Sequence, residues 1–420
     1  LTISDGEVSM EGGAGARWIS MEMPDLGWAL RLKEETEGKT VMTRSGSTIT
    51  ITGIGTCTDT DIVVASYYYG YPVKWIGESA FSGLTQIKSI RLSDTVERIQ
   101  SYAFRDCTSL ESIYIGSGFR EFNSNAFWGC GNISKIEIDP DNKFYEGKNC
   151  IINKSQKALV LGCRTTVIPA DGSVTRIDGL AFIDVHGLTS ITIPEGVTSL
   201  GEDAFSGCPD LKSIHFSSTV NSFELVSVMG CDALEVITVD PKNPRFYSSG
   251  NCVIEKETGT LFLGCGGSVI PNDGSIKKIG YYAFGSNDSL TNIVIPNGVT
   301  HIDGYAFAGC AGLKEVILPD SVTQVGFGVF SGCSSLESIS VPFVGASRMA
   351  SDYSAVFGYI FGYTATTADW SYTTSYDFIN SSHSISGTTW QYTCIPSTKY
   401  DNSSNPYKTT YYNYYIRKTL

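Results

Sequence analysis

The sequence has few charged residues, few histidines and no long apolar run. Charged side chains make up 17% of its 420 residues, and 30 Lys plus Arg stand against 43 Asp plus Glu. Nucleic acids and anionic lipid surfaces require clustered cations, so neither is an expected partner. No run of about 20 apolar residues occurs, so we expect no membrane insertion. The chain begins at Leu1 without a signal sequence, and we expect it to be part of a longer protein.

The four histidines are scattered along the chain, and no two have the spacing of metal ligands. His215 lies between Ser213 and Ser217 on a predicted strand, which would be compatible with a hydrolase. Nucleophilic catalysis also needs a carboxylate to orient the histidine, and the pattern offers none. We therefore predict no enzyme, no metal and no cofactor, and keep His215 as a candidate ligand contact.

A short phrase recurs along most of the chain at steps of mainly 23 residues: a small residue and Phe, then Gly-Cys, Leu, an Ile-x-Ile run and Pro. A fixed period of this length is typical of a solenoid, in which each repeat packs on its neighbours. The small-Phe pair occurs at Ala80-Phe81, Ala103-Phe104, Ala126-Phe127, Ala181-Phe182, Ala204-Phe205, Ala283-Phe284, Ala306-Phe307 and Val329-Phe330.

Each repeat predicts one rung of the solenoid. The Ile-x-Ile run has a period of two, which indicates a short strand with both Ile side chains inward. Pro ends that strand because it has no N–H group for the ladder. A Val-x-x-Ile step gives a second inward pair, and the small-Phe pair fits a short helical turn. Stacked rungs would bury one continuous apolar column.

Two long repeats interrupt the period, since 55 residues separate Phe127 from Phe182 and Met229 from Phe284. Both contain an Asp-Pro turn, Asn-Cys, Leu-Gly-Cys and Val-Ile-Pro, so a unit of about 100 residues is duplicated. Each insert is expected to form a β-hairpin, centred near Gln156-Lys157 or Thr258-Gly259. The acidic turn at Asp139, Asp141 and Asn142 is compatible with calcium, but turn formation is favoured.

Six of the twelve cysteines share one repeat position, which predicts a ladder of buried thiols: Cys107, Cys130, Cys208, Cys231, Cys310 and Cys333. Cys150 with Cys163, and Cys252 with Cys265, flank the two hairpins instead. If the partners face each other, each pair can form a cross-strand disulfide in an exported protein. A reduced, packed pair is equally consistent with the sequence.

Ligand contacts are expected at outward strand positions and in the last segment. The outward set is mixed: Arg91, Tyr114, Glu137, Thr192, His215, Thr238, Val294, Ile317 and Ser340. Apolar Val294 and Ile317 form either a binding patch or a surface that the C-terminal segment covers. That segment combines aromatic rings with Ser, Thr and Asn, which suits protein or glycan binding or packing beneath a loop. Its candidates are Tyr359, Tyr363, Trp370 and Trp390.

The ends of the chain lack the repeat. We predict a cap or preceding region at 1–46, the solenoid at 47–345, and an irregular Tyr/Ser/Thr-rich segment at 346–420. Within the first region, Pro24 to Leu30 could open a short helix.

The repeat resembles the BspA-like leucine-rich repeats of bacterial surface proteins. The resemblance rests on Ser190-Ile191-Thr192-Ile193-Pro194, on Ile76-Gly77 with Ala80-Phe81, and on the insert motifs. It implies a leucine-rich-repeat solenoid, mainly β with short helical turns, in a right-handed α/β-type superhelix.

The same resemblance implies secretion or display on a bacterial cell surface, and adhesion to a host or microbial protein or glycan. A structural stalk and an accessory module of a carbohydrate-active enzyme are the alternatives. We expect a monomer with an extracellular protein or glycan ligand.

Overall fold

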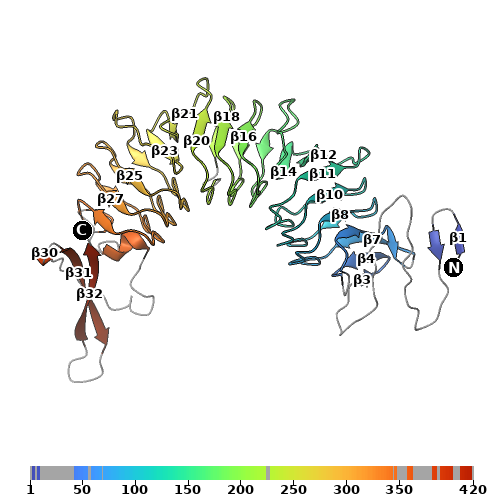
Figure 1. The fold of residues 1–420 in the computed structure, drawn as a ribbon, viewed down its shortest axis with the longest axis horizontal. Helices are drawn as coiled ribbons and strands as arrows, with labels where there is room; N and C mark the ends of the chain where they lie inside the picture. Colours follow the sequence, from blue (N-terminus) through green and yellow to red (C-terminus); the bar gives the residue numbers. More distant parts are fainter. Residues whose placement is uncertain are drawn as a thin grey trace. The chain divides into compact units, whose positions relative to one another are not determined.

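The computed structural model describes residues 2–4, 7–9, 42–54, 58–68, 70–223, 228–343, 345–347, 357–362, 381–385, 388–400 and 407–418. The chain forms two compact units. Unit 1 comprises residues 1–210 and 222–228, and unit 2 comprises residues 211–221 and 229–420. Both are built from the predicted rungs, and the strands of successive rungs lie side by side within each unit (Figure 1).

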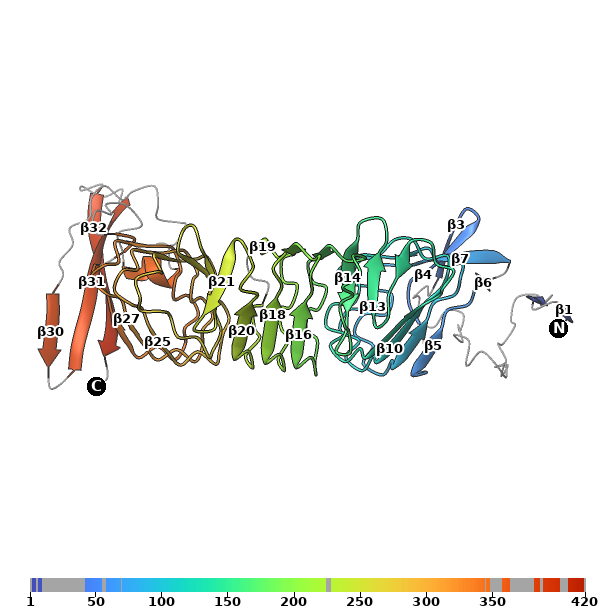
Figure 2. The same ribbon diagram turned by 90° about the horizontal axis from the view of Figure 1, so that it is seen from above.

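In unit 1, two sets of parallel strands line opposite sides of the rungs (Figure 2). The first set carries the Ile-x-Ile runs: β5 (Asp61–Val63), β8 (Ser89–Arg91), β10 (Ser112–Ile115), β11 (Lys135–Ile138) and β16 (Ser190–Ile193). The second set carries the Val-x-x-Ile steps: β4 (Thr48–Ile51), β7 (Tyr71–Ile76), β9 (Arg98–Ile99), β15 (Arg176–Ile177), β17 (Ser199–Leu200) and β19 (Ser222–Phe223). Antiparallel strands β3 (Met42–Ser45) and β6 (Tyr67–Tyr68) flank β4 and β7. Hence the sheet begins at Met42, before the predicted start at 47. A separate hairpin joins β1 (Thr2–Ser4) to β2 (Glu7–Ser9).

Unit 2 repeats this plan. Its Ile-x-Ile strands are β18 (Ser213–Phe216), β20 (Val236–Val239), β25 (Asn292–Val294), β27 (Glu315–Ile317) and β29 (Ser338–Ser340). Its short return strands are β24 (Lys278–Ile279), β26 (His301–Ile302) and β28 (Gln324–Val325).

The two inserts form the predicted hairpins, each as part of a three-stranded arrangement. In unit 1 these strands are β12 (Tyr145–Glu146), β13 (Cys150–Asn153) and β14 (Ala158–Gly162). In unit 2 they are β21 (Phe246–Ser249), β22 (Cys252–Glu255) and β23 (Thr260–Leu263). The last strand of each hairpin pairs in parallel with β15 or β24. The insert therefore supplies the return strand of its own rung, and the stack continues without interruption within the unit.

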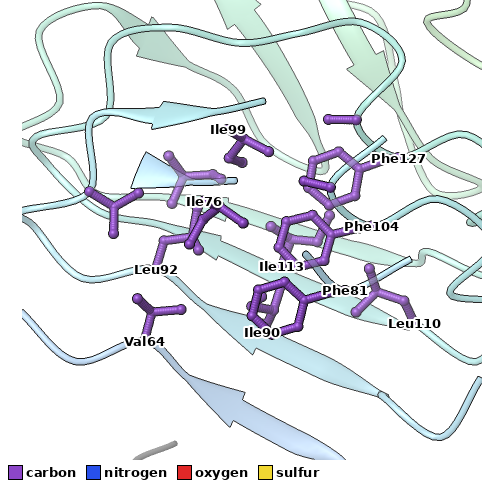
Figure 3. Packing of buried hydrophobic residues seen from close by; sticks show 14 of the residues in the cluster. Val64, Ile76, Phe81, Ile90, Leu92, Ile99, Phe104, Leu110, Ile113 and Phe127 are labelled. Atoms are coloured by element: carbon purple, nitrogen blue, oxygen red, sulfur yellow. The ribbon is translucent and has the colours of Figure 1, made fainter. Parts of the chain in front are cut away.

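A column of phenylalanine rings fills the centre of the rungs, as the small-Phe pairs predict. The rings of Phe81 and Phe104 stack with centroids 4.9 Å apart, and Phe104 stacks on Phe127 at 4.9 Å. These rings pack against inward Ile side chains such as Ile90 and Ile113, which are 2% exposed (Figure 3). One rung could not bury these groups alone, so each rung depends on its neighbours.

The small-Phe segments form single turns, as expected, and do not continue into helices. Within one rung, the N–H of Arg105 donates to the Tyr102 carbonyl at 3.0 Å, which closes a four-residue turn. Alternate N–H groups instead donate to the next rung, as Phe104 does to the Ala126 carbonyl at 2.8 Å. Because these groups serve a ladder between rungs, they cannot also form a continuous helical ladder.

The C-terminal part of unit 2 contains regular structure that the sequence analysis did not predict. A 3-10 helix, η2 (Phe357–Phe361), accepts hydrogen bonds from Gly328 and Phe330, the positions that face the next rung elsewhere. Three antiparallel strands follow, namely β30 (Ser381–Ile385), β31 (Thr388–Tyr400) and β32 (Tyr407–Lys418). The short helix suggested for Pro24 to Leu30 lies outside the described residues.

Candidate ligand-binding surface

The outward side chains of the Ile-x-Ile strands form what we call the strand face of each unit. Register pairs place Val63, Arg91, Tyr114 and Glu137 in one row across unit 1. In unit 2, His215 lies beside Thr238, and Val294, Ile317 and Ser340 lie in one row. The positions predicted to face outward therefore do so, because the inward alternate residues are fixed by the core.

The sequence analysis missed one outward residue in each insert. Val167 and Val269 are 81% and 71% exposed, whereas the next residues, Ile168 and Ile270, are buried. The preceding inward positions hold Thr166 and Ser268, so these segments keep the alternation of an Ile-x-Ile-Pro strand with a hydroxyl in place of the first Ile. The polar residue is tolerated there because it is bonded: the Ser268 hydroxyl donates to the Asn251 carbonyl at 2.8 Å.

The strand face of unit 2 carries an apolar strip, which we define as Val269, Val294 and Ile317. Val294 and Ile317 are register partners and are 78% and 57% exposed. The insert segment lies beside the β25 rung, since a side chain at Gly266 would meet the Ser289 hydroxyl. Three exposed β-branched side chains thus follow one another on successive rungs. Such contiguous apolar exposure is uncommon on a soluble surface and marks interaction sites.

The strand face of unit 1 carries a polar cluster instead. The Arg91 guanidinium lies 3.6 Å from the centroid of the Tyr114 ring, and the Tyr114 hydroxyl donates to Asp139 at 2.7 Å. Burial and the bond to Asp139 raise the pKa of Tyr114. The same bond from Tyr114 lowers the pKa of the Asp139 carboxyl. Tyr114, a predicted contact, is therefore half-buried and fixed between a cation and an anion.

On the strand face of unit 2, Nδ1 of His215 lies 2.9 Å from the Thr238 hydroxyl. Within the described ranges, no three His, Cys, Asp or Glu side chains are placed so that they could hold a metal ion. Asp139 takes part in turn chemistry, since its Oδ1 accepts the Asp141 N–H at 2.9 Å. Asn142 is buried and donates to the Gly116 and Phe119 carbonyls of the preceding rung.

The repeat cysteines form the predicted ladder of buried thiols. In five of them the sulfur lies 2.9–3.2 Å from the carbonyl of a Phe 26 residues earlier, namely in Cys107, Cys130, Cys208, Cys310 and Cys333. This contact joins the turn of one rung to the Phe column of the rung before it. These five cysteines therefore act as small core residues that bond to the neighbouring rung.

The hairpin cysteines are also free thiols in this structure. Cys150 lies opposite Gly162, not opposite Cys163, because Asn153 pairs with Ala158 and the hairpin is centred at Ser155-Gln156, one residue before the predicted centre. The β-bulge between Ile151 and Ile152 corrects only half of this offset. The assumption that the two cysteines face each other directly is therefore wrong. Burial raises the pKa of Cys150 to about 11.

The second insert behaves in the same way. Ile254 pairs with Leu261, so this hairpin is centred at Glu257-Thr258, again one residue before the predicted centre, and the bulge between Val253 and Ile254 corrects only half of the offset. Burial raises the pKa of Cys252 to about 12. Burial also raises the pKa of Cys265. Both hairpins thus hold protonated, poorly nucleophilic thiols at neutral pH.

Of the C-terminal candidates, Tyr359 lies on η2, where its half-buried ring meets Phe327 edge-on at 5.4 Å. Trp390 lies on β31, whose backbone pairs with both neighbouring strands. Tyr363 and Trp370 lie outside the described residues. No helix in the part of the chain that the structure describes combines the length and apolarity needed to cross a membrane.

Comparison with known proteins agrees with the repeat architecture. The model of the BspA type leucine rich repeat region matches residues 74–167, 155–252 and 261–357. No curated relative matches this chain.

Three solved structures illustrate the likeness. A leucine rich cell surface protein from Faecalibacterium prausnitzii is 23% identical and covers 80% of this chain and 98% of its own length, with a TM-score of 0.43. A leucine-rich repeat protein from Eubacterium ventriosum is 18% identical over 72% of this chain and 93% of its own, with a TM-score of 0.42. The pneumococcal vaccine antigen PcpA is 16% identical over 72% and 81%, with a TM-score of 0.36.

Proposed function

This chain belongs to the family of BspA-type leucine-rich repeat proteins, and on that premise we propose that it is a bacterial surface module that adheres to an extracellular protein. Membership of this repeat family, whose repeats resemble those of bacterial surface proteins, supports display outside the cell. The proposed role is binding rather than catalysis, and the repeat surface is the binding element.

The observation that carries this proposal is the apolar strip. Its three side chains are each more than half exposed, and burying one aliphatic side chain contributes about 1.5–3 kcal/mol. Exposure of this kind favours a partner that covers it. Because aliphatic carbons form no hydrogen bonds, the strip suits an apolar segment of a protein better than the hydroxyls of a glycan.

Substitution of the strip tests the proposal. The wild-type chain is immobilised and screened against extracellular-matrix proteins and secreted bacterial proteins. The variants Val269→Asp and Val294→Asp are then assayed for binding to each protein that the wild-type chain binds. We expect each variant to weaken saturable binding at least about tenfold, because a carboxylate would be buried in the interface.

Val167→Asp is the matched control, since Val167 holds the same outward position in the other insert and is 81% exposed. It should leave binding unchanged. Equal loss in the control would contradict the strip as the site. Absence of binding by the wild-type chain to every protein on the panel would favour the structural stalk.

A further inference from the structure

The polar cluster of unit 1 consists of Arg91, Tyr114 and Asp139, and it lies apart from the apolar strip of unit 2 in the sequence. Arg98, Arg105, Arg120 and Arg176 each have a carboxylate within 4.0 Å. Arg91 differs, because no carboxylate of the described residues lies within 4.0 Å of its guanidinium, which donates no side-chain hydrogen bond among them. Beside the bond from Tyr114, the charge of Arg91 nevertheless contributes to lowering the pKa of Asp139. Arg91 is exposed on β8, and its close contact in that part of the chain is the Tyr114 ring on β10.

The Tyr114 ring holds that guanidinium in place. The ring is anchored at its hydroxyl by the 2.7 Å bond to Asp139, and Asp139 is in turn held by the turn that it caps with Asp141. A guanidinium stacked on an aromatic ring keeps its in-plane N–H groups available. These N–H groups match the two oxygens of one carboxylate, and pre-organisation reduces the entropy lost on binding.

The surroundings limit what the carboxylate can belong to. Exposed Glu137 lies in the same row and exposed Asp61 lies in the adjacent column, and Lys135 is already paired with Glu137 at 2.9 Å. Arg91, which has no salt bridge within 4.0 Å in the described residues, can bind one carboxylate, whereas the neighbouring carboxylates and the net charge of −13 repel a polyanion. Ser89 and Ser112 are register partners in the adjacent column, and the Ser89 hydroxyl donates to Asp61.

We propose that Arg91, stacked on Tyr114, binds the carboxylate of a single sugar-acid residue, while the neighbouring hydroxyls and Asp139 bond to the sugar hydroxyls. A saccharide fits better than a protein segment because the neighbouring outward positions offer donors and acceptors and no apolar strip.

The test measures binding of sialyllactose and of a glucuronate-terminated disaccharide by calorimetry, with lactose as the neutral control. Both acids should bind, and lactose should bind at least about tenfold more weakly, as expected when a hydrogen bond to a charged group is lost. Arg91→Gln should abolish this preference. Arg91→Lys should restore it only in part, because an ammonium offers no planar fork.

Tyr114→Phe removes the anchoring hydroxyl and should weaken acid binding several-fold. Arg105→Gln is the control, since Arg105 is paired with Asp106 and lies away from the strand face. Thermal unfolding of each variant confirms that it is folded.

Equal binding of lactose, or equal loss in the control, would overturn the proposal. So would binding of an acidic peptide of the Asp-Glu type in place of both sugars. The strip variants Val269→Asp and Val294→Asp should leave sugar-acid binding unchanged, so the two proposals can fail separately.

Discussion

Units 1 and 2 have the same interior and different strand faces. In unit 1 the rings of Phe81 and Phe104 stack at 4.9 Å, and in unit 2 those of Phe284 and Phe307 stack at 5.0 Å. Outside, unit 1 presents a stacked arginine, a tyrosine and carboxylates, whereas unit 2 presents three exposed aliphatic side chains. Stacking constrains the inward positions of every rung, while the outward positions are free to specify ligands.

The largest expected loss of stability comes from substitutions in the Phe column that both units share. Phe104→Ala in unit 1 and Phe307→Ala in unit 2 each remove a fully buried ring that stacks on two others. Each should lower the free energy of unfolding by about 3–5 kcal/mol. Urea unfolding monitored by circular dichroism measures the loss, and hydrogen exchange locates it.

The exposed ring of Phe144 supplies the control, and Phe144→Ala should cost less than about 1 kcal/mol. If the two buried variants differed by more than about 2 kcal/mol, the interiors of the two units would not be equivalent.

The reactivity of the hairpin thiols gives a second comparison between the two units. With pKa values of about 11 and about 12, Cys150 and Cys252 are almost fully protonated at pH 8. Iodoacetamide should alkylate native Cys150 about 100-fold more slowly than an ordinary thiol, and Cys252 about 1000-fold more slowly. Peptide mass mapping gives the rate at each site, and the urea-unfolded chain serves as the reference.

The same mapping without reductant tests the redox state. A peptide linking Cys150 to Cys163, or Cys252 to Cys265, would contradict the free thiols of the structure. The rate of Cys150 would then be uninformative until the bond was reduced.

A buried asparagine stabilises each insert in the same way. Asn142 donates to two carbonyls of the rung before it and accepts the N–H groups of Phe144 and Tyr145. Asn243 makes the corresponding four bonds. Asn142→Ala and Asn243→Ala should each cost on the order of 3 kcal/mol, because buried backbone groups lose their partners.

Urea midpoints of the two variants, compared at one pH, test this expectation. Asn→Asp at either site is a stricter probe, since a carboxylate keeps the acceptors and loses the donors. A cost below about 1 kcal/mol for both alanine variants would mean that water replaces the side chain.

Much of this interior could be predicted from the sequence, because the Ile-x-Ile runs and the small-Phe pairs recur often enough to average out local exceptions. Val167 and Val269 were missed because Thr166 and Ser268 hide the alternation, and only their hydrogen bonds make them acceptable inward residues. Each hairpin register was missed because the turn is centred one residue earlier than predicted, and neither the turn position nor the one-residue bulge that follows has a sequence signature here. The stacking of Arg91 on Tyr114 requires knowing that the two residues are register partners.

The smallest expected effect concerns the second position after the column Phe, where unit 1 has Asp184 and unit 2 has Ser286. Both adopt a positive φ, 56° and 52°. Burial raises the pKa of Asp184, opposed by the charge of His186. The folded state therefore holds its proton to higher pH than the unfolded state, and stability falls as pH rises from the ordinary Asp pKa through the raised value.

Asp184→Ser, which installs the residue of unit 2, should remove this dependence. The variant should equal the wild-type chain in stability at about pH 3.5 and exceed it at pH 7, by less than about 1 kcal/mol since the carboxyl is only half-buried. Urea midpoints of both proteins across this range give the difference. A wild-type chain that gained stability relative to the variant as pH rose would show that His186 dominates over burial, and the two units would then differ in electrostatics at a position where they share a backbone.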